Sequence, residues 1–376
     1  MIVRARTEID EGLIRGLLAG ASYDLQAPSS CYFFNSGSSS LRFFLQLIGK
    51  GKRVGVQVYT CSTVCDAIIK EGCIPVFLDI DTSYYTTTID CVKNKIDQID
   101  VLLLTHLFGV PNPDYLQIKQ LCREHHVILI DDLCQTFHAK VGDCYLEDLS
   151  DNYIYSFFYD KPISSISGGM LKVSDDYKVI AEEKCTQLSR EDDEQGKKKL
   201  KVLLLMHLLL APELYDREFR YGTLWKKLLE RWPLTWNMKL LKYLVNGKWV
   251  SLINRVFGPQ KEDGIWLLSN IEIYYLLAVM SSFRNRNQFL VDFFVRNGLV
   301  LPPYLQNSSI TCSVAKRAIV DCCVESSGIQ VGLFNWPELI CDTNDYCKFP
   351  NAEIVIRTHT NIPCWMDISM RAYKKR

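Results

Sequence analysis

The chain has 376 residues, enough for a large domain with a buried core and a second, smaller domain. Apolar residues make up 48% of the chain and charged residues 23%, as in ordinary globular proteins. The 43 basic and 43 acidic side chains cancel, so no overall field would attract nucleic acid or an anionic membrane surface.

The 15 cysteines form no Cys-x-x-Cys pair, so the sequence predicts no structural zinc site and no other metal site. Their odd number, and an N-terminus without the apolar stretch of a secretory signal, favour reduced thiols in the cytoplasm. No apolar run reaches the roughly 18 residues that a membrane-spanning helix needs.

Short apolar runs alternate with helical patterns through the first half of the chain. The predicted strands are Arg53–Val58, Pro75–Ile80, Val101–Thr105, Val127–Ile130, Tyr153–Phe157 and Met170–Val173. The predicted helices are Ser38–Ile48, Thr63–Glu71 and Asp114–His125, the last with a start near Asn112-Pro113. Apolar strands separated by helices predict an α/β fold with a mostly parallel sheet, covered by helices on both faces.

The second half is more helical. Long helical patterns fill residues 174 to 260, and the helix Ile271–Phe289 is followed by short strand-like pieces. We therefore expect a large α/β domain over 1–260, with a helical segment at about 184–260, and a small α+β domain over 261–376. The basic and then apolar segment Lys197–Ala211 fits a helix packed on the large domain, or one lying at a membrane surface.

Ligands of parallel sheets bind at the carboxyl ends of the strands, and three motifs fall at such positions. The first, Asn35-Ser-Gly-Ser-Ser-Ser-Leu41, opens a predicted helix with a glycine and several hydroxyls. Free backbone N–H groups at a helix start bind phosphate. An ordinary serine N-cap would give the same pattern.

The second and third motifs carry ionisable groups. Val127–Gln135 is an apolar strand that ends in Asp131, Asp132 and, three residues on, Gln135. A carboxylate there could pair with the pyridine nitrogen of a cofactor, or simply belong to a polar loop. Tyr155–Lys161 is an aromatic strand followed by Lys161, which could bind an aldehyde cofactor covalently or be a surface lysine.

The order of these motifs resembles that of the DegT/DnrJ-type sugar aminotransferases, which depend on pyridoxal 5'-phosphate (PLP) and have fold type I of the aspartate aminotransferase superfamily. That family carries a Ser-Gly-Thr-Ala-Ala-Leu phosphate loop, a Glu-Asp-Ala-Ala-Gln strand end and a Ser-Phe-x-x-x-Lys segment. The counterparts here are Asn35–Leu41, Asp131-Asp-Leu-Cys-Gln135 and Ser156-Phe-Phe-Tyr-Asp-Lys161. Val76-Phe-Leu-Asp-Ile-Asp81 and His106-Leu-Phe-Gly109 are similar to two further family segments.

The resemblance implies a role for each matching residue. Lys161 would hold PLP covalently and then move the proton, Asp132 would pair with the pyridine nitrogen, and Gln135 would face the 3-hydroxyl. The implied phosphate contacts are Ser156, Ser38 and the backbone of Gly37 and Ser39.

Two positions depart from the family. Members usually stack an aromatic residue on the cofactor ring, but at that position in this chain Tyr59-Thr60 is followed by Cys61. We expect that either Cys61 packs on the ring or another side chain does. Many members also have a Gly-Tyr-Asn-Tyr-Arg segment, whose Asn contributes to the phosphate site of the partner subunit. The corresponding segment here is Gly264-Ile-Trp-Leu-Leu-Ser269, which has neither Asn nor Arg.

The resemblance implies an enzyme of nucleotide-sugar and polysaccharide biosynthesis: a homodimeric, cytoplasmic aminotransferase. It would move an amino group from a donor such as glutamate to a keto group of a nucleotide-linked sugar. Family dehydratases have His in place of Lys161, which argues against dehydration. The alternative is a non-catalytic homologue that keeps the fold as a binding or regulatory module. The altered positions favour this alternative, and the intact Lys161, Asp132 and Gln135 oppose it.

Overall fold

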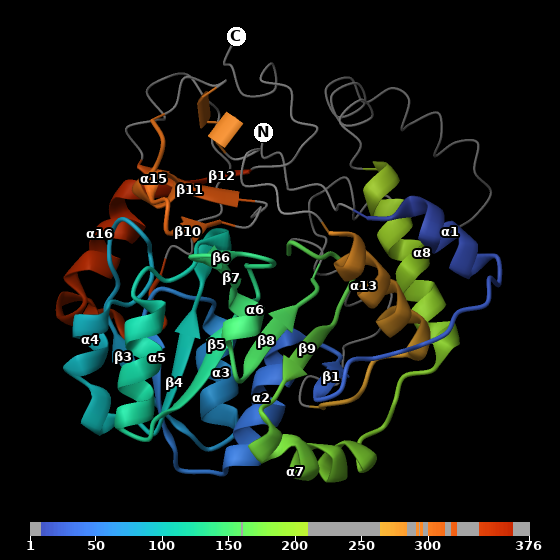
Figure 1. The fold of residues 1–376 in the computed structure, drawn as a ribbon, viewed down its shortest axis with the longest axis horizontal. Coiled ribbons are helices and arrows are strands. Elements are labelled where there is room, and N and C mark those ends of the chain that lie inside the picture. Colours follow the sequence, from blue (N-terminus) through green and yellow to red (C-terminus); the bar gives the residue numbers. More distant parts are fainter. Residues whose placement is uncertain are drawn as a thin grey trace.

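A seven-stranded sheet forms the centre of the molecule (Figure 1). The structure, a computed structural model, describes residues 9–158, 161–209, 264–283, 291–292, 294–295, 300–312, 317–321 and 338–363. The strand order is β1-β9-β8-β5-β4-β2-β3. The strands are β1 (Cys31–Phe34), β2 (Arg53–Gln57), β3 (Ile74–Leu78), β4 (Val101–Thr105), β5 (Ile128–Asp132), β8 (Tyr153–Ser156) and β9 (Gly169–Lys172).

The sheet is mostly parallel, as predicted, and each predicted strand lies within two residues of an observed one. Strand β1 was not predicted, and β9 runs antiparallel to both β8 and β1. The reason lies in the connection. Parallel strands need a crossover, usually a helix, whereas residues 157–168 between β8 and β9 form no helix in their described part. The chain therefore turns back beside β8, and this return segment contains Lys161.

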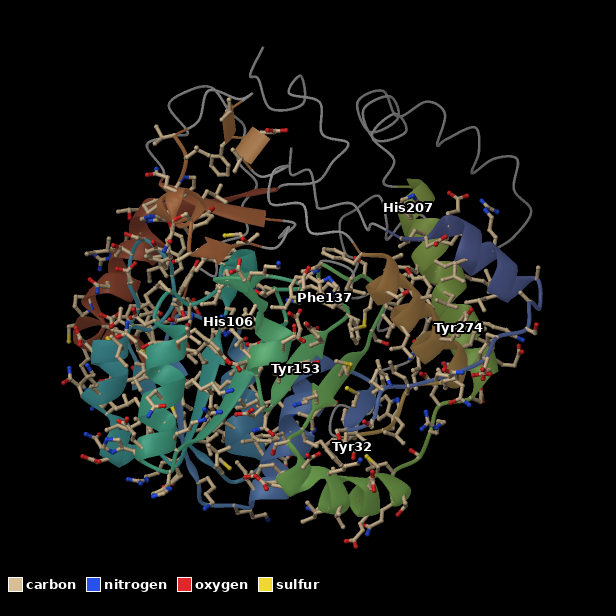
Figure 2. The ribbon with its side chains drawn as sticks, in the orientation of Figure 1. Tyr32, His106, Phe137, Tyr153, His207 and Tyr274 are labelled. Atoms are coloured by element: carbon tan, nitrogen blue, oxygen red, sulfur yellow. The ribbon has the colours of Figure 1, made fainter. Side chains whose placement is uncertain are left out.

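Helices cover both faces of the sheet because side chains alternate along each strand. On β4, Val101 and Leu103 pack with one group of helices, while Leu102 and Leu104 pack with the other. The first group is α2 (Gly37–Ile48), α3 (Ser62–Lys70) and α7 (Asp175–Thr186). The second group is α4 (Ile89–Lys93), α5 (Tyr115–Glu124), α1 (Glu11–Leu18), α8 (Asp193–Leu209), α13 (Asn270–Ser282) and the short α6 (Leu146–Leu149). Figure 2 shows Tyr32 of β1 beside α7, where its hydroxyl donates to the Lys178 carbonyl.

Helix α8 packs on the large sheet together with α1 and α13. Leu200 and Leu203 are fully buried, and the Lys199 ammonium is buried between the carboxylates of Glu191 and Glu272. In its described part the segment from Lys197 is thus a packed helix, with a basic residue facing inward. None of the helices in the described ranges has the length and apolarity to cross a membrane.

Helix α13 is shorter than the predicted Ile271–Phe289. It ends at Ser282, Phe283 is extended, and residues 284–289 lie outside the described ranges. Ile271 and Leu276 join the core beneath the large sheet. The division of the chain at residue 260 remains a prediction, since residues 210–263 are also not described.

The C-terminal elements lie beyond the carboxyl ends of the parallel strands (Figure 1). They are α15 (Pro303–Gln306), β10 (Ile310–Thr311), β11 (Arg317–Asp321), η4 (Thr343–Lys348), α16 (Pro350–Thr358) and β12 (His359–Pro363). Strand β10 extends the small hairpin of β6 (Lys140–Val141) and β7 (Cys144–Tyr145). Tyr304 and Val355 pack with Tyr59 and Phe108, which follow β2 and β4. The C-terminal elements therefore border the strand ends where a ligand is expected.

Asp79, just after β3, links the first turn of α16 to the sheet through hydrogen bonds. Its carboxylate accepts the backbone N–H groups of Asn351 (3.2 Å) and Ala352 (3.0 Å) in the first turn of α16. A negative charge there satisfies N–H groups that have no partner within the helix, and it opposes the positive end of the helix dipole. This contact joins residues 272 positions apart in the sequence.

Asp79→Ala should therefore loosen the C-terminal elements. The loss of a helix-capping carboxylate typically costs about 0.5–2 kcal/mol. We expect a lower urea midpoint and faster proteolysis around α16, with a smaller change for Asp79→Asn, which keeps one acceptor oxygen. Unchanged proteolysis of α16 in Asp79→Ala would show that this contact does not hold the helix.

Candidate active site

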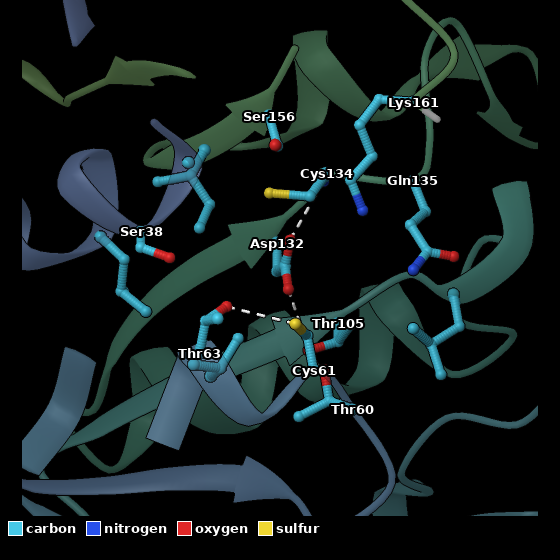
Figure 3. A pocket seen from close by; sticks show the side chains of 15 residues that line it. Ser38, Thr60, Cys61, Thr63, Thr105, Asp132, Cys134, Gln135, Ser156 and Lys161 are labelled. Atoms are coloured by element: carbon cyan, nitrogen blue, oxygen red, sulfur yellow. Dashed lines mark hydrogen bonds between the residues drawn. The ribbon is translucent and has the colours of Figure 1, made fainter. Parts of the chain in front are cut away.

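A cavity at the carboxyl ends of β2, β4, β5 and β8 collects most of the predicted site residues (Figure 3). It spans about 510 Å³ of space, part of which is open to solvent. The predicted residues that line it are Gly37, Ser38, Cys61, Asp132, Gln135, Ser156 and Lys161. Residues that the sequence analysis did not select line it too: Leu41, Thr60, Thr63, Val64, Thr105, Leu107, Cys134 and Ile154.

Helix α2 presents its first turn to this cavity. Ser36 is the N-cap, and its hydroxyl accepts the Ser39 N–H (3.0 Å). The motif is therefore an ordinary serine N-cap and, at the same time, a helix start that opens with a glycine. The Ser39 side chain is buried beside Ser36 and lines a neighbouring cavity instead. Of the expected phosphate-loop residues, Gly37 and Ser38 face the main cavity.

Two glycines allow this loop to approach the strands closely. A Cβ atom on Gly37 would lie 2.8 Å from the Ser156 Cβ, and one on Gly169 would lie 2.4 Å from the Ser36 carbonyl oxygen. Atoms cannot approach so closely without movement of the backbone. The absence of side chains at both positions therefore brings the start of α2 and Ser156 to one wall of the cavity.

Asp132 forms the base of the cavity. Its side chain is 5% exposed, and its oxygens accept the Cys134 N–H (3.0 Å) and, at 3.5 Å, the Thr105 hydroxyl. Burial and the neighbouring Asp132 carboxylate raise the pKa of the Cys134 thiol well above its usual range. At neutral pH the thiol is therefore protonated and a poor nucleophile.

Lys161 and Gln135 line the cavity near Asp132 (Figure 3). The Lys161 backbone is held at both ends: its N–H donates to the Phe158 carbonyl (3.0 Å) and its carbonyl accepts the Ser164 hydroxyl (3.1 Å). The Gln135 oxygen accepts the Phe108 N–H (3.1 Å). Residues 159 and 160 of this lysine motif lie outside the described ranges.

Cys61 lies at the start of α3, with its sulfur 3.2 Å from the Thr63 hydroxyl. Small side chains, Thr60, Cys61 and Thr63, thus line the part of the cavity that follows β2. Thr60 and Thr105 could have been found from sequence, because each comes at or just after the end of an apolar strand. Cys134 could have been found because it lies between Asp132 and Gln135.

Asp131 points to the opposite face of β5. Its carboxylate accepts hydrogen bonds from the Tyr115 hydroxyl (3.0 Å) and the Ser150 hydroxyl, and it pairs with the His106 Nε2 (3.2 Å). Burial, and then the Asp131 charge, raise the pKa of Tyr115 far above its usual range, so this phenol stays a donor. The described residues form no cluster of three or more metal-ligating side chains.

Comparisons with known proteins agree with the motifs. Residues 27–203 match the model of the DegT/DnrJ/EryC1/StrS aminotransferase family. GDP-perosamine synthase of Vibrio cholerae is 27% identical over 44% of this chain and 44% of its own length. UDP-N-acetyl-3-dehydro-α-D-glucosamine 3-aminotransferase of Acidithiobacillus ferrooxidans is 29% identical over 37% and 39%. The chain thus spans less than half the length of these curated relatives.

Among solved structures, NtdA of Bacillus subtilis with its cofactor PMP bound is similar to this chain, with a TM-score of 0.54. The likeness covers 89% of this chain and 68% of that one at 14% identity, which establishes the fold. The fold is that of the fold-type-I PLP-dependent transferases, as predicted. Within this class, the resemblance to the DegT/DnrJ/EryC1/StrS aminotransferase family covers residues 27–203, slightly less than half of the chain.

Proposed function

We propose that this protein is a PLP-dependent aminotransferase. It moves an amino group from an amino acid such as glutamate to a keto group of a nucleotide-linked sugar. The observation that carries the proposal is the cavity in which Lys161, Asp132 and Gln135 meet beside the start of α2. The two curated relatives, named for nucleotide-sugar products or substrates, support the substrate class. We also propose that the enzyme works in polysaccharide biosynthesis and that it lies in the cytoplasm. The predicted reduced thiols favour the cytoplasmic location.

The residues present fit PLP. Asp132 is a buried carboxylate, and a buried carboxylate favours a cationic partner such as a protonated pyridine nitrogen. The first turn of α2, with the Ser38 and Ser156 hydroxyls, offers donors for a phosphate. Lys161 supplies the amine that an aldehyde cofactor needs. Ser39 does not line this cavity, and its N–H already donates to the Ser36 hydroxyl, so we assign the phosphate contacts to Ser38, Ser156 and the start of α2.

Each residue then has a separate task. When bound, PLP supplies an electron sink for the carbon that loses its proton. Lys161 holds the cofactor and moves the proton with its amine. Asp132 keeps the pyridine nitrogen protonated, because an opposite charge within contact distance favours the charged form. Gln135 and the small side chains after β2 position the ring. Thr105, Asp132 and Ile154, which lie in register on three neighbouring strands, form the side of the cavity that faces the sheet.

Covalent attachment tests the proposal directly. Sodium borohydride should fix PLP to the wild-type protein at Lys161, and the protein should be yellow. Lys161→Ala should lose both the visible absorbance and the adduct, whereas Lys172→Ala, whose ammonium donates to the Asp151 carbonyl outside the site, should keep them. Full trapping in Lys161→Ala would assign the attachment to another lysine. A colourless wild-type protein would favour the non-catalytic alternative.

The two adjacent aspartates separate chemistry from stability. Asp132→Asn should still bind PLP through Lys161, yet half-transamination with glutamate should slow by orders of magnitude because the charge facing the pyridine nitrogen is gone. Asp131→Asn should slow it much less and should instead lower stability by about 1–3 kcal/mol, because a buried network loses its acceptor. Stopped-flow spectra and urea titrations measure the two effects. Equal, mild losses of rate would mean that neither carboxylate faces the ring.

We further propose a homodimer with two-fold symmetry, the commonest form of oligomer. The cavity is partly open to solvent, and a partner subunit would complete it. Light scattering of the PLP-loaded protein at micromolar concentration should give twice the monomer mass of 43.3 kDa. A fully active, PLP-loaded monomer would contradict this assembly.

A further inference from the structure

The Gln135 amide has only one orientation that the structure allows. A backbone N–H can only donate, so the atom that faces the Phe108 N–H at 3.1 Å must be the amide oxygen. The NH₂ group, which carries two donors, is thereby the end left for the cavity. Figure 3 shows the Gln135 nitrogen turned toward the centre of the site and the oxygen turned away. Gln135 is therefore a donor toward a bound ligand.

Phe108, whose N–H binds the Gln135 oxygen, has an unusual backbone conformation. Phe108 lies in the turn η2 (Leu107–Gly109) with φ 55° and ψ 25°, in the left-handed region that non-glycine residues seldom adopt. Surrounding contacts must hold such a residue in place. The Val110 N–H donates to the Leu107 carbonyl (2.9 Å), and Phe108 packs against Tyr85.

The imidazole of His106 closes this turn. His106 is fully buried, and its Nδ1 accepts the N–H of Asn112 (3.0 Å), six residues further along the chain. Because Nδ1 accepts, the proton of the neutral ring lies on Nε2, which donates to Asp131 (3.2 Å). The His106 carbonyl accepts the Thr136 hydroxyl (2.7 Å), and the Asn112 side chain donates to the Thr87 carbonyl (2.8 Å).

We propose that His106, held by Asp131, is a positioning residue. By closing the 106–112 turn, His106 fixes the position of the Phe108 N–H. The Phe108 N–H in turn holds the Gln135 amide with its NH₂ group toward the phenolic oxygen of the cofactor. The effect on the cofactor rests on the proposed function; the effect on the turn does not. A donor to that oxygen favours its anionic form. Without a fixed donor, the pH at which the bound cofactor changes colour should rise.

The first arm of the test needs no cofactor. Hydrogen–deuterium exchange of residues 106–112 in the cofactor-free protein should accelerate in His106→Leu, which cannot accept the Asn112 N–H. It should change little in His106→Asn, whose carbonyl oxygen can accept in its place. Ile118→Val is the matched control, since it trims a buried side chain of α5 and removes no hydrogen bond. Unchanged exchange in His106→Leu would overturn the proposal.

The second arm follows the visible absorbance of the PLP-loaded protein against pH. His106→Leu should raise the midpoint by about one pH unit, the size expected for loss of a hydrogen bond to a charged group. In a Gln135→Met background, His106→Leu should cause no further shift, because the residue through which it acts is gone. Equal shifts in both backgrounds would overturn the proposal. A wild-type protein without absorbance would defeat the proposed function, while the exchange arm would still decide the role of His106.

Discussion

The alternation of side chains at the end of β5 is the constraint on which the site depends. Adjacent residues of a strand point to opposite faces, so Asp131 and Asp132 serve different environments although both are buried. Asp132 lies in register with Thr105 of β4 and Ile154 of β8, and these three residues share the cavity face. Asp131 lies in register with Leu104 and Tyr153, over the helices of the other face.

This division separates a carboxylate that faces the cavity from one that belongs to a buried hydrogen-bond network. Asp132 accepts the Cys134 N–H (3.0 Å) and, at 3.5 Å, the Thr105 hydroxyl, and its side chain lines the cavity. Asp131 has the Tyr115 and Ser150 hydroxyls and the His106 ring as donors, and these compensate for its burial. The same strand end thereby anchors α5, the turn after β4 and the floor of the cavity.

The other wall of the site depends on close packing rather than charge. Strand β9 runs back beside β8 and past the start of α2, and Gly169 allows the Ser36 carbonyl to lie against β9. Ser38 therefore meets Ser156 and Lys161, which lie far from it in the sequence. The C-terminal elements, tied to β3 by Asp79, border the same edge of the sheet. A change in their position would alter the rim of the site without touching its base.

The sequence by itself determined the strands β2 to β5, the helices between them and the motifs at their ends, because hydrophobic periodicity and residue chemistry are local. It also pointed to Asp132, Gln135 and Lys161. Only the tertiary structure decided what depends on contacts between distant segments. It placed β1 and β9 antiparallel at the edge, removed Ser39 from the cavity through the Ser36 cap and buried Lys199 between two carboxylates. It also oriented the Gln135 amide through Phe108, because the direction of a hydrogen bond follows from which segments meet and not from either segment alone.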